Sequence, residues 1–496
     1  MTAPASSPSA RRYELGALCL FIAIAAVLRL HNLAARGFWL DEGISVGIAR
    51  LHWPDFARVL WEREANMSLY YLLLRGWLTF GGGEFFIRAL SALSGVAAVP
   101  LIYGLGRRLF GTRVGLAAAG LLAINAYHLR YSQEARAYPL AVLLALASAW
   151  LFVRFVESHG ARSGIAWAAV SALLVYSHFY GALVVAAELL SLPIARPRGM
   201  HWSAILRPVR LLALFTLPVV AFLAVRGASQ MNWIPRVSFA SLWSDFVLFT
   251  GNGGSPLAVI VVAAMLVALR SWRESWRADR RSFQNWSLAA MWSWAAFPVL
   301  AVLAGSVWRP LFLTRYLIVC LPALILVVAI GIFRIRPLPL RVLAFASIAL
   351  LSARGILSYY KSDFGAYHED WRGATRALLV SARPDDGLIF YPGPSRMDYE
   401  FYRSLDLPSA SPRVIFPAHG NPPTQLSFRD FLVQPLAEVI ENLPSDAPRV
   451  WIVLDSPQGW YENDRSYPFL RAWCLWHYHQ VSAQKFDGVE LVLFSK

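Results

Sequence analysis

The sequence predicts an integral membrane protein, all-α in its membrane part, with a small α/β domain at its C-terminal end. Three observations lead to this prediction. The 496 residues are 57% hydrophobic and only 15% charged. Apolar runs of roughly twenty residues, the length that crosses a bilayer, recur as far as residue 358. Beyond that point the long runs cease, and short segments typical of strands replace them.

Hydropathy predicts about eleven transmembrane helices. They lie near residues 14–35, 85–105, 114–131, 138–154, 163–180, 182–195, 208–225, 256–270, 287–306, 315–333 and 341–358. Arginines fill every second connection, from Arg107 and Arg108 to Arg334 and Arg336. Because cytoplasmic loops are rich in Lys and Arg, this pattern predicts a cytoplasmic N-terminus and an extracytoplasmic C-terminal domain.

The first outer loop contains two segments, Trp53–Arg63 and Leu69–Phe80, that we expect to be juxtamembrane helices. The second is apolar over only about twelve residues, which is too short to cross a bilayer. Counting it as a span would also break the alternation of the arginines.

The predicted domains are a membrane domain over residues 1–358 and an extracytoplasmic α/β domain over residues 359–496. In the second, we expect a helix at Asp370–Ala382 and further helical segments near 428–443 and 466–479. Strands are predicted at 387–391, 413–416, 450–454 and 489–494. The domain has neither a Gly-rich dinucleotide fingerprint nor a P-loop.

Charge and cysteine content exclude several classes of function. The net charge is +16, but the basic residues are spread between the apolar runs instead of forming one patch, so we expect no nucleic-acid partner. The three cysteines lie far apart and form neither a disulfide framework nor a metal-binding spacing.

Two adjacent carboxylates, Asp41 and Glu42, follow the first apolar run. Neighbouring helical residues point about 100° apart, so one can act in catalysis while the other holds a neighbour in place. A partly buried carboxylate is a suitable general base for a hydroxyl nucleophile. The alternative is a solvated pair that caps a juxtamembrane helix.

A second charged cluster, Glu134, Arg136 and Tyr138, separates two apolar runs on the same predicted side. The planar guanidinium of Arg136 suits a phosphate, and Glu134 suits a role in orienting Arg136 or a substrate hydroxyl. The alternative is a local ion pair at a helix end. A divalent cation held by Asp41 and Glu134 is left open, although no spacing of ligands specifies a metal.

His178, Arg315 and Tyr316 stand at the outer ends of later spans. Arg315 is suited to a lipid phosphate, and His178 to a substrate contact. The alternatives are an interfacial aromatic belt for His178 and snorkelling for the arginine.

The order of these motifs resembles that of the GT-C membrane glycosyltransferases that use polyprenyl-phosphate sugars. This superfamily includes protein O-mannosyltransferases and the bacterial transferase that adds aminoarabinose to lipid A. The segments that carry the resemblance are Trp39–Glu42, Leu69–Leu74, Glu84–Ser91, Tyr131–Tyr138, Tyr176–Gly181 and Pro310–Tyr316. Many relatives have a His/Lys-Pro-Pro-like stretch before Leu-Tyr-Tyr, where this chain has Asn66-Met67-Ser68. A basic contact to the donor phosphate is therefore expected from elsewhere, for example from Arg315.

The resemblance implies a GT-C-like bundle in a bacterial plasma membrane and a site on its extracytoplasmic side. Asp41 is implied as the catalytic base of an inverting transfer, with Glu42 beside it. The implied substrate-binding residues are Glu134, Arg136, Tyr138, His178, Arg315 and Tyr316. The donor is a polyprenyl-phosphate-linked sugar, and the acceptor is a hydroxyl of a lipid, glycan or protein. Two rival hypotheses are a multi-span transporter or lipid flippase, against which the sequence shows no related halves, and a noncatalytic assembly or sensor protein.

Overall fold

The computed structural model describes residues 8–227, 234–238, 240–365, 369–405, 412–420, 426–431, 437–440, 442–455 and 466–496. The chain forms two compact units. The first, the helical unit, comprises Met1–His31, Ala65–Tyr70 and Arg88–Gly365. The second, the mixed unit, comprises Asn32–Glu64, Tyr71–Ile87 and Ala366–Lys496. Two early segments thus belong with the C-terminal residues, and the domain limits predicted at 358 and 359 remain a prediction.

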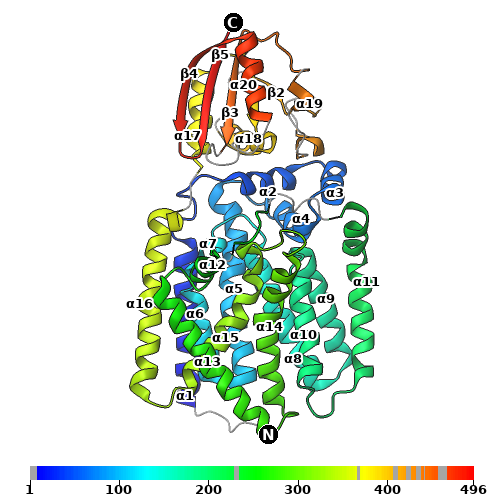
Figure 1. Cartoon of the computed structure of the whole chain (residues 1–496), viewed down its shortest axis with the longest axis vertical. Helices are drawn as coiled ribbons and strands as arrows, with labels where there is room; N and C mark the ends of the chain where they lie inside the picture. Colours follow the sequence, from blue (N-terminus) through cyan, green and yellow to red (C-terminus); the bar gives the residue numbers. More distant parts are fainter. Residues whose placement is uncertain are drawn as a thin grey trace. The chain divides into compact units, whose positions relative to one another are not determined.

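Helices, most of them long and apolar, make up the helical unit (Figure 1). They are α1 (Pro8–Leu30), α5 (Glu84–Phe110, whose first turn belongs to the mixed unit), α6 (Thr112–Ala123), α7 (Ala126–Ser132), α8 (Tyr138–Ser158), α9 (Ala161–Ser177), α10 (Gly181–Ile194), α11 (Trp202–Arg226), α12 (Leu242–Phe249), α13 (Ser255–Ala278), α14 (Phe283–Gly305), α15 (Leu321–Arg334) and α16 (Leu338–Ser362). Short 3₁₀ helices are η1 (Ala65–Met67), η3 (Thr314–Cys320) and η4 (Asp363–Gly365).

Eight helices in the described part of the chain are long and apolar enough to cross a membrane, and α6 and α10 are shorter apolar helices. The most enclosed candidate is Thr314–Arg334, of which 94% of the apolar window is buried. The predicted class, a multi-pass helical membrane protein with a small C-terminal sheet domain, is confirmed. The count of eleven spans remains a prediction.

The predicted span at 114–131 is two helices, α6 and α7, that meet at Asn125. The side-chain oxygen of Asn125 accepts a hydrogen bond from the backbone N–H of His128 at 2.8 Å, which caps α7. Hydropathy alone did not predict this break, because an asparagine cap is a local hydrogen-bonding effect within an apolar run.

Three short helices precede α5 in the sequence: α2 (Leu40–Arg50), α3 (Trp53–Glu62) and α4 (Ser68–Trp77). The last two confirm the helices predicted at Trp53–Arg63 and Leu69–Phe80. Their place at the membrane surface remains a prediction.

The C-terminal residues of the mixed unit form a five-stranded sheet with the strand order β2-β1-β3-β5-β4. Its strands are β1 (Gly387–Tyr391), β2 (Arg413–Phe416), β3 (Arg449–Asp455), β4 (His479–Phe486) and β5 (Val489–Ser495). The first three strands are mutually parallel, while β5 runs antiparallel to both β3 and β4. The helices of this region are α17 (Trp371–Ser381), α18 (Arg396–Leu405), α19 (Ala437–Ile440) and α20 (Ser466–His477), with 3₁₀ turns η5 (Gly393–Ser395) and η6 (Phe428–Phe431).

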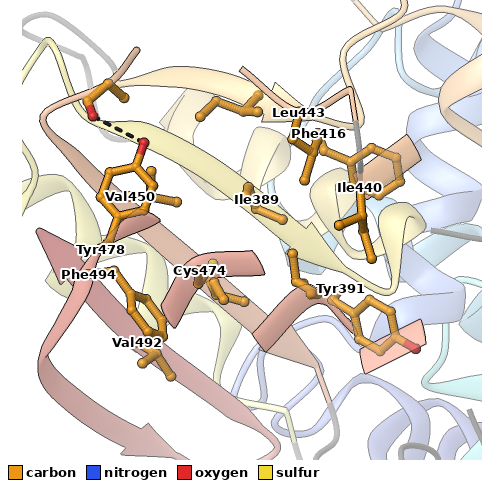
Figure 2. Close-up of a cluster of buried hydrophobic side chains, with 14 of the residues drawn as sticks. Ile389, Tyr391, Phe416, Ile440, Leu443, Val450, Cys474, Tyr478, Val492 and Phe494 are labelled. Carbon is orange, nitrogen blue, oxygen red and sulfur yellow. Dashed lines mark hydrogen bonds between the residues drawn. The ribbon is translucent and has the colours of Figure 1, made fainter. Parts of the chain in front are cut away.

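One face of this sheet packs on α20 to form an apolar core (Figure 2). Ile389 and Val450 come from the parallel strands, Phe494 from β5, and Cys474 from α20. At the edge of the core, the hydroxyl of Tyr478 donates to the carbonyl of Ala447 at 3.2 Å.

All four predicted strands of this region are present, but β4 and α18 were missed. The strand β4 has mostly exposed, polar side chains, so it has no apolar periodicity to reveal it. Its signal is the two-residue turn Asp487-Gly488, since Phe486 pairs with Val489 and Gly488 has a φ of +67°. Part of the helix predicted at 428–443 lies outside the described residues.

Candidate active site

The predicted site residues are divided between the two units. Asp41 and Glu42 belong to the mixed unit. The helical unit contains Glu134, Arg136, Tyr138, His178, Arg315 and Tyr316.

Asp41 and Glu42 lie in the first turn of α2. Trp39, the residue before this helix, provides no side-chain cap. A carboxylate distant in sequence does so instead: Oε2 of Glu369 accepts hydrogen bonds from the backbone N–H of Leu40 at 2.8 Å and from Nε1 of Trp371 at 3.1 Å. Asp41 is half-buried and Glu42 only 1% exposed, so the two adjacent carboxylates have different surroundings.

Two further buried carboxylates interact with this group. Asp398, on α18, and Asp455, at the end of β3, are 0% and 2% exposed. Burial, followed by the charge of Glu369, raises the pKa of both Asp398 and Asp455 well above the usual range. Burial also raises the pKa of Glu369 to about 7, against the opposing effect of its hydrogen bonds from Leu40 and Trp371. Sequence analysis missed these three acids, because none of them follows an apolar run of membrane length.

In the helical unit, Glu134 forms an ion pair with Arg130 (3.6 Å). The same guanidinium lies 3.0 Å from Asp363, which follows α16. Arg130 therefore joins two acids that are more than two hundred positions apart. The sequence analysis considered only Arg136 as the partner of Glu134 and overlooked Arg130, one turn of helix earlier.

Tyr138, His178 and Tyr316 come together in one aromatic cluster, with Tyr131 and Tyr180 at its edges. The ring centroids of His178 and Tyr316 are 4.8 Å apart, and those of Tyr138 and His178 are 6.0 Å apart. Tyr131 lies 5.0 Å from Tyr138, and Tyr180 lies 5.3 Å from Tyr316. Helices α7, α8 and η3 and the turn after α9 thus all contribute to the cluster.

His178 has a defined hydrogen-bonding state within this cluster. Its Nδ1 accepts a hydrogen bond from the backbone N–H of Tyr180 at 3.2 Å, which places the proton of a neutral ring on Nε2. The side chain is 1% exposed, and its Nε2 has no hydrogen-bond partner among the residues that the structure describes.

Two guanidinium groups accompany His178. The Cζ atom of Arg136 lies 5.8 Å from the ring centroid of Tyr138, and that of Arg315 lies 6.0 Å from the ring centroid of Tyr316. Both are close enough to interact electrostatically with His178. Two cations and a buried N–H donor form a site suited to an anion. In the described ranges, no group of three or more His, Cys, Asp or Glu side chains is arranged to hold a metal ion.

One protein-family model matches part of the chain. Residues 67–225 match the family model described as dolichyl-phosphate-mannose-protein mannosyltransferase. No curated protein sequence matches the chain.

Solved structures match over nearly the whole chain. ArnT from Cupriavidus metallidurans in the apo state has a TM-score of 0.63 and 15% identity, over 97% of this chain and 98% of that chain. The same protein bound to undecaprenyl phosphate gives a TM-score of 0.61 with the same identity and coverage. The archaeal oligosaccharyltransferase AglB from Archaeoglobus fulgidus, in complex with an inhibitory peptide and a dolichol-phosphate, gives a TM-score of 0.54 at 14% identity, over 98% and 74% of the two chains. The resemblance inferred from the motifs is thus confirmed: the chain has the GT-C fold of polyprenyl-phosphate-sugar-dependent membrane glycosyltransferases.

Proposed function

We propose that the protein is an integral-membrane glycosyltransferase of the extracytoplasmic side of a bacterial plasma membrane. It transfers a sugar from a polyprenyl-phosphate donor to a hydroxyl acceptor with inversion at the anomeric carbon. The observation that carries the proposal is the anion site formed by Arg136, Arg315 and the unpartnered Nε2–H of His178, in a chain with the GT-C fold.

In this reaction, the acceptor oxygen attacks the anomeric carbon from the face opposite the phosphate. The bond between that carbon and the phosphate oxygen breaks, and the polyprenyl phosphate leaves with the electron pair. Arg136, Arg315 and His178 stabilise its charge. The acceptor proton passes to a carboxylate oxygen of Asp41. We assign Glu42 to holding Asp41 in place, because Glu42 is almost fully buried, and Tyr138 and Tyr316 to packing on the donor beside the arginines.

The donor assignment is supported by two relatives of the same fold, one bound to undecaprenyl phosphate and one to a dolichol-phosphate. The acceptor stays open between a lipid, a glycan and a protein. A transporter or flippase is not favoured, since the fold and the family match both point to sugar transfer.

The test uses purified full-length protein in lipid with radiolabelled polyprenyl-phosphate hexoses and pentoses. We expect wild-type protein to release or transfer the sugar, and Asp41→Asn to lower the rate about 10²–10⁴-fold, the usual effect of losing a general base. Asp446→Asn, which removes an exposed carboxylate of the mixed unit that pairs with Arg413 at the surface, is the matched control. Full activity of Asp41→Asn would refute the role of Asp41, and accumulation of substrate without product would favour transport.

A further inference from the structure

The proposed base, Asp41, lies in α2, and the N-terminus of this helix is capped by a carboxylate from a distant part of the chain. The first N–H groups of a helix have no partner within the helix, and here the N–H of Leu40 donates to Glu369 at 2.8 Å. Glu369 is held in turn by Nε1 of Trp371, the first residue of α17. The bonded N–H belongs to the residue directly before Asp41.

Helix α18 packs closely against the same turn of α2, where Asp398 lies beside Gly43. A Cβ atom added to Gly43 would lie 2.2 Å from Oδ1 of Asp398, so only glycine permits this approach. Neither carboxylate oxygen of Asp398 has a hydrogen-bond partner among the described residues, although the side chain is fully buried. An unpaired buried carboxylate thus faces the turn that carries Asp41 and Glu42.

Among the described residues, four acids interact electrostatically with Glu369. They are Asp41 and Glu42 on α2, Asp398 on α18 and Asp455 on β3. Asp455 is the last residue of the parallel strand β3, and Asp398 follows the parallel strand β1; ligands and functional groups gather at the carboxyl ends of such strands in open α/β sheets. The sheet region therefore contributes three carboxylates to the surroundings of the catalytic helix.

We propose that Glu369 is a positioning residue for the proposed reaction: it fixes the first turn of α2, and its negative charge favours transfer of the acceptor proton to Asp41. This inference rests on the proposed function, and it gives the C-terminal region a part in the reaction. The role assigned to Glu369 requires no contact with the substrate. It acts through the backbone of Leu40 and through the field at Asp41.

The sign of the pH dependence follows from the charge. Glu369 has a pKa of about 7, so its charge is present above pH 7 and lost below it. A negative charge on Glu369 favours transfer of the acceptor proton to Asp41 more than a neutral Glu369 does. Activity should therefore rise with pH through about 7. Burial, followed by the charge of Glu369, raises the pKa of Asp398 and Asp455 well above the usual aspartate range, so a variant that removes this charge lowers the pKa of both.

The experiment compares kcat and KM against pH for wild type, Glu369→Gln and Glu369→Ala in the full-length protein in lipid. The glutamine keeps an oxygen that accepts from Leu40 but cannot ionise. We expect it to lose the rise near pH 7, to have a kcat about tenfold lower at pH 8, the scale of one lost charge at close range, and to keep the wild-type KM for the donor. Alanine, which also removes the helix cap, should lower kcat further. Glu62→Gln, at a half-buried glutamate of α3 paired with the exposed Arg58, is the matched control and should keep the wild-type profile.

The outcomes separate this inference from the proposed function. A rise near pH 7 that persists in Glu369→Gln, or variants whose only defect is less folded protein, would overturn the role of Glu369 while Asp41→Asn remained inactive. Transfer that is absent in wild type, or unaffected in Asp41→Asn, would instead refute the proposed function itself.

Discussion

The guanidinium of Arg29, on α1, donates from Nη2 to Nδ1 of His128, on α7, at 2.8 Å. The same side chain donates to the carbonyls of Ala123 at 3.0 Å and Leu122 at 3.1 Å, which end α6. Arg29 is completely buried. It therefore donates to the last carbonyls of one helix and to the imidazole of the next, at the place where hydropathy predicted a single span.

Replacing Arg29 with methionine should destabilise the helical unit by about 2–4 kcal/mol, because it removes the buried donor to two carbonyls and an imidazole nitrogen. The measurement is thermal unfolding of the purified protein in detergent. Arg270→Met, which removes an arginine that is 85% exposed, should leave the midpoint unchanged. Equal midpoints for both variants would contradict the structural role of Arg29.

Arg130 offers a second prediction through its two acidic neighbours. Arg130→Met should destabilise the protein by about 3 kcal/mol, since breaking a largely buried ion pair by removing one partner leaves charge uncompensated. Glu134 and Asp363 both lie within ion-pair distance of Arg130, so the double variant Arg130→Met with Asp363→Asn should lose less than the sum of the single changes. Additive losses would show that Arg130 and Asp363 do not interact.

His178→Phe tests the anion site directly. Phenylalanine retains an aromatic ring beside Tyr138 and Tyr316 but removes the Nε2–H donor, so binding of polyprenyl phosphate should weaken roughly 10–100-fold, the value of a hydrogen bond to a charged group. Affinity is measured with labelled polyprenyl phosphate in lipid. Tyr176→Phe, which removes a hydroxyl that donates to the carbonyl of Phe215, is the control. Unchanged affinity in His178→Phe would place the phosphate elsewhere.

Much of the fold could be predicted because its signals are local. Apolar runs of membrane length, and short β-branched runs between turn residues, identify the helices of the bundle and four of the five strands. The break at Asn125 and the strand β4 were not predicted, because a helix cap and a polar edge strand leave the hydropathy pattern unchanged.

The candidate site was predictable only in part, for a physical reason. Asp41 and Glu42 stand out because two carboxylates follow an apolar run. Glu369 and Asp398 do not, since their importance comes from contacts with α2 more than three hundred positions away. Such pairing depends on the tertiary fold, which no local pattern encodes.

The hydrogen bonds of Asp386 indicate how the stability of the sheet region changes with pH. It accepts from Nε of Arg449 at 2.8 Å, from Nη2 of Arg449 at 2.6 Å and from Nε1 of Trp451 at 2.9 Å. These bonds hold the pKa of Asp386 below its usual value of 3.8, although burial opposes them. The stabilisation is therefore present above pH 3.8 and is lost as pH falls through the lower pKa of the folded state.

Asp386→Asn should accordingly destabilise the protein by about 3 kcal/mol near neutral pH and flatten the loss of stability below pH 4. Tryptophan fluorescence during urea unfolding at pH 3 to 7 follows the change. Asp446→Asn, at an exposed aspartate whose pair with Arg413 is screened by solvent, should change unfolding much less. A variant of Asp386 that unfolds with the wild-type dependence on pH would show that these bonds do not stabilise the folded state.

Gly43 tests the packing of the helix that carries Asp41. An added Cβ would lie 2.2 Å from Oδ1 of Asp398, so Gly43→Ala should push α18 away and destabilise the protein by about 1–3 kcal/mol, as overpacking does. Because the shift displaces the first turn of α2, sugar transfer should fall as well. Gly76→Ala is the matched control on α4, where a Cβ meets no atom within 4 Å and a small gain in helix stability is expected. Thermal unfolding and transfer rate are measured on both variants. If Gly43→Ala behaves like Gly76→Ala, the close contact between Asp398 and α2 does not constrain the position of Asp41.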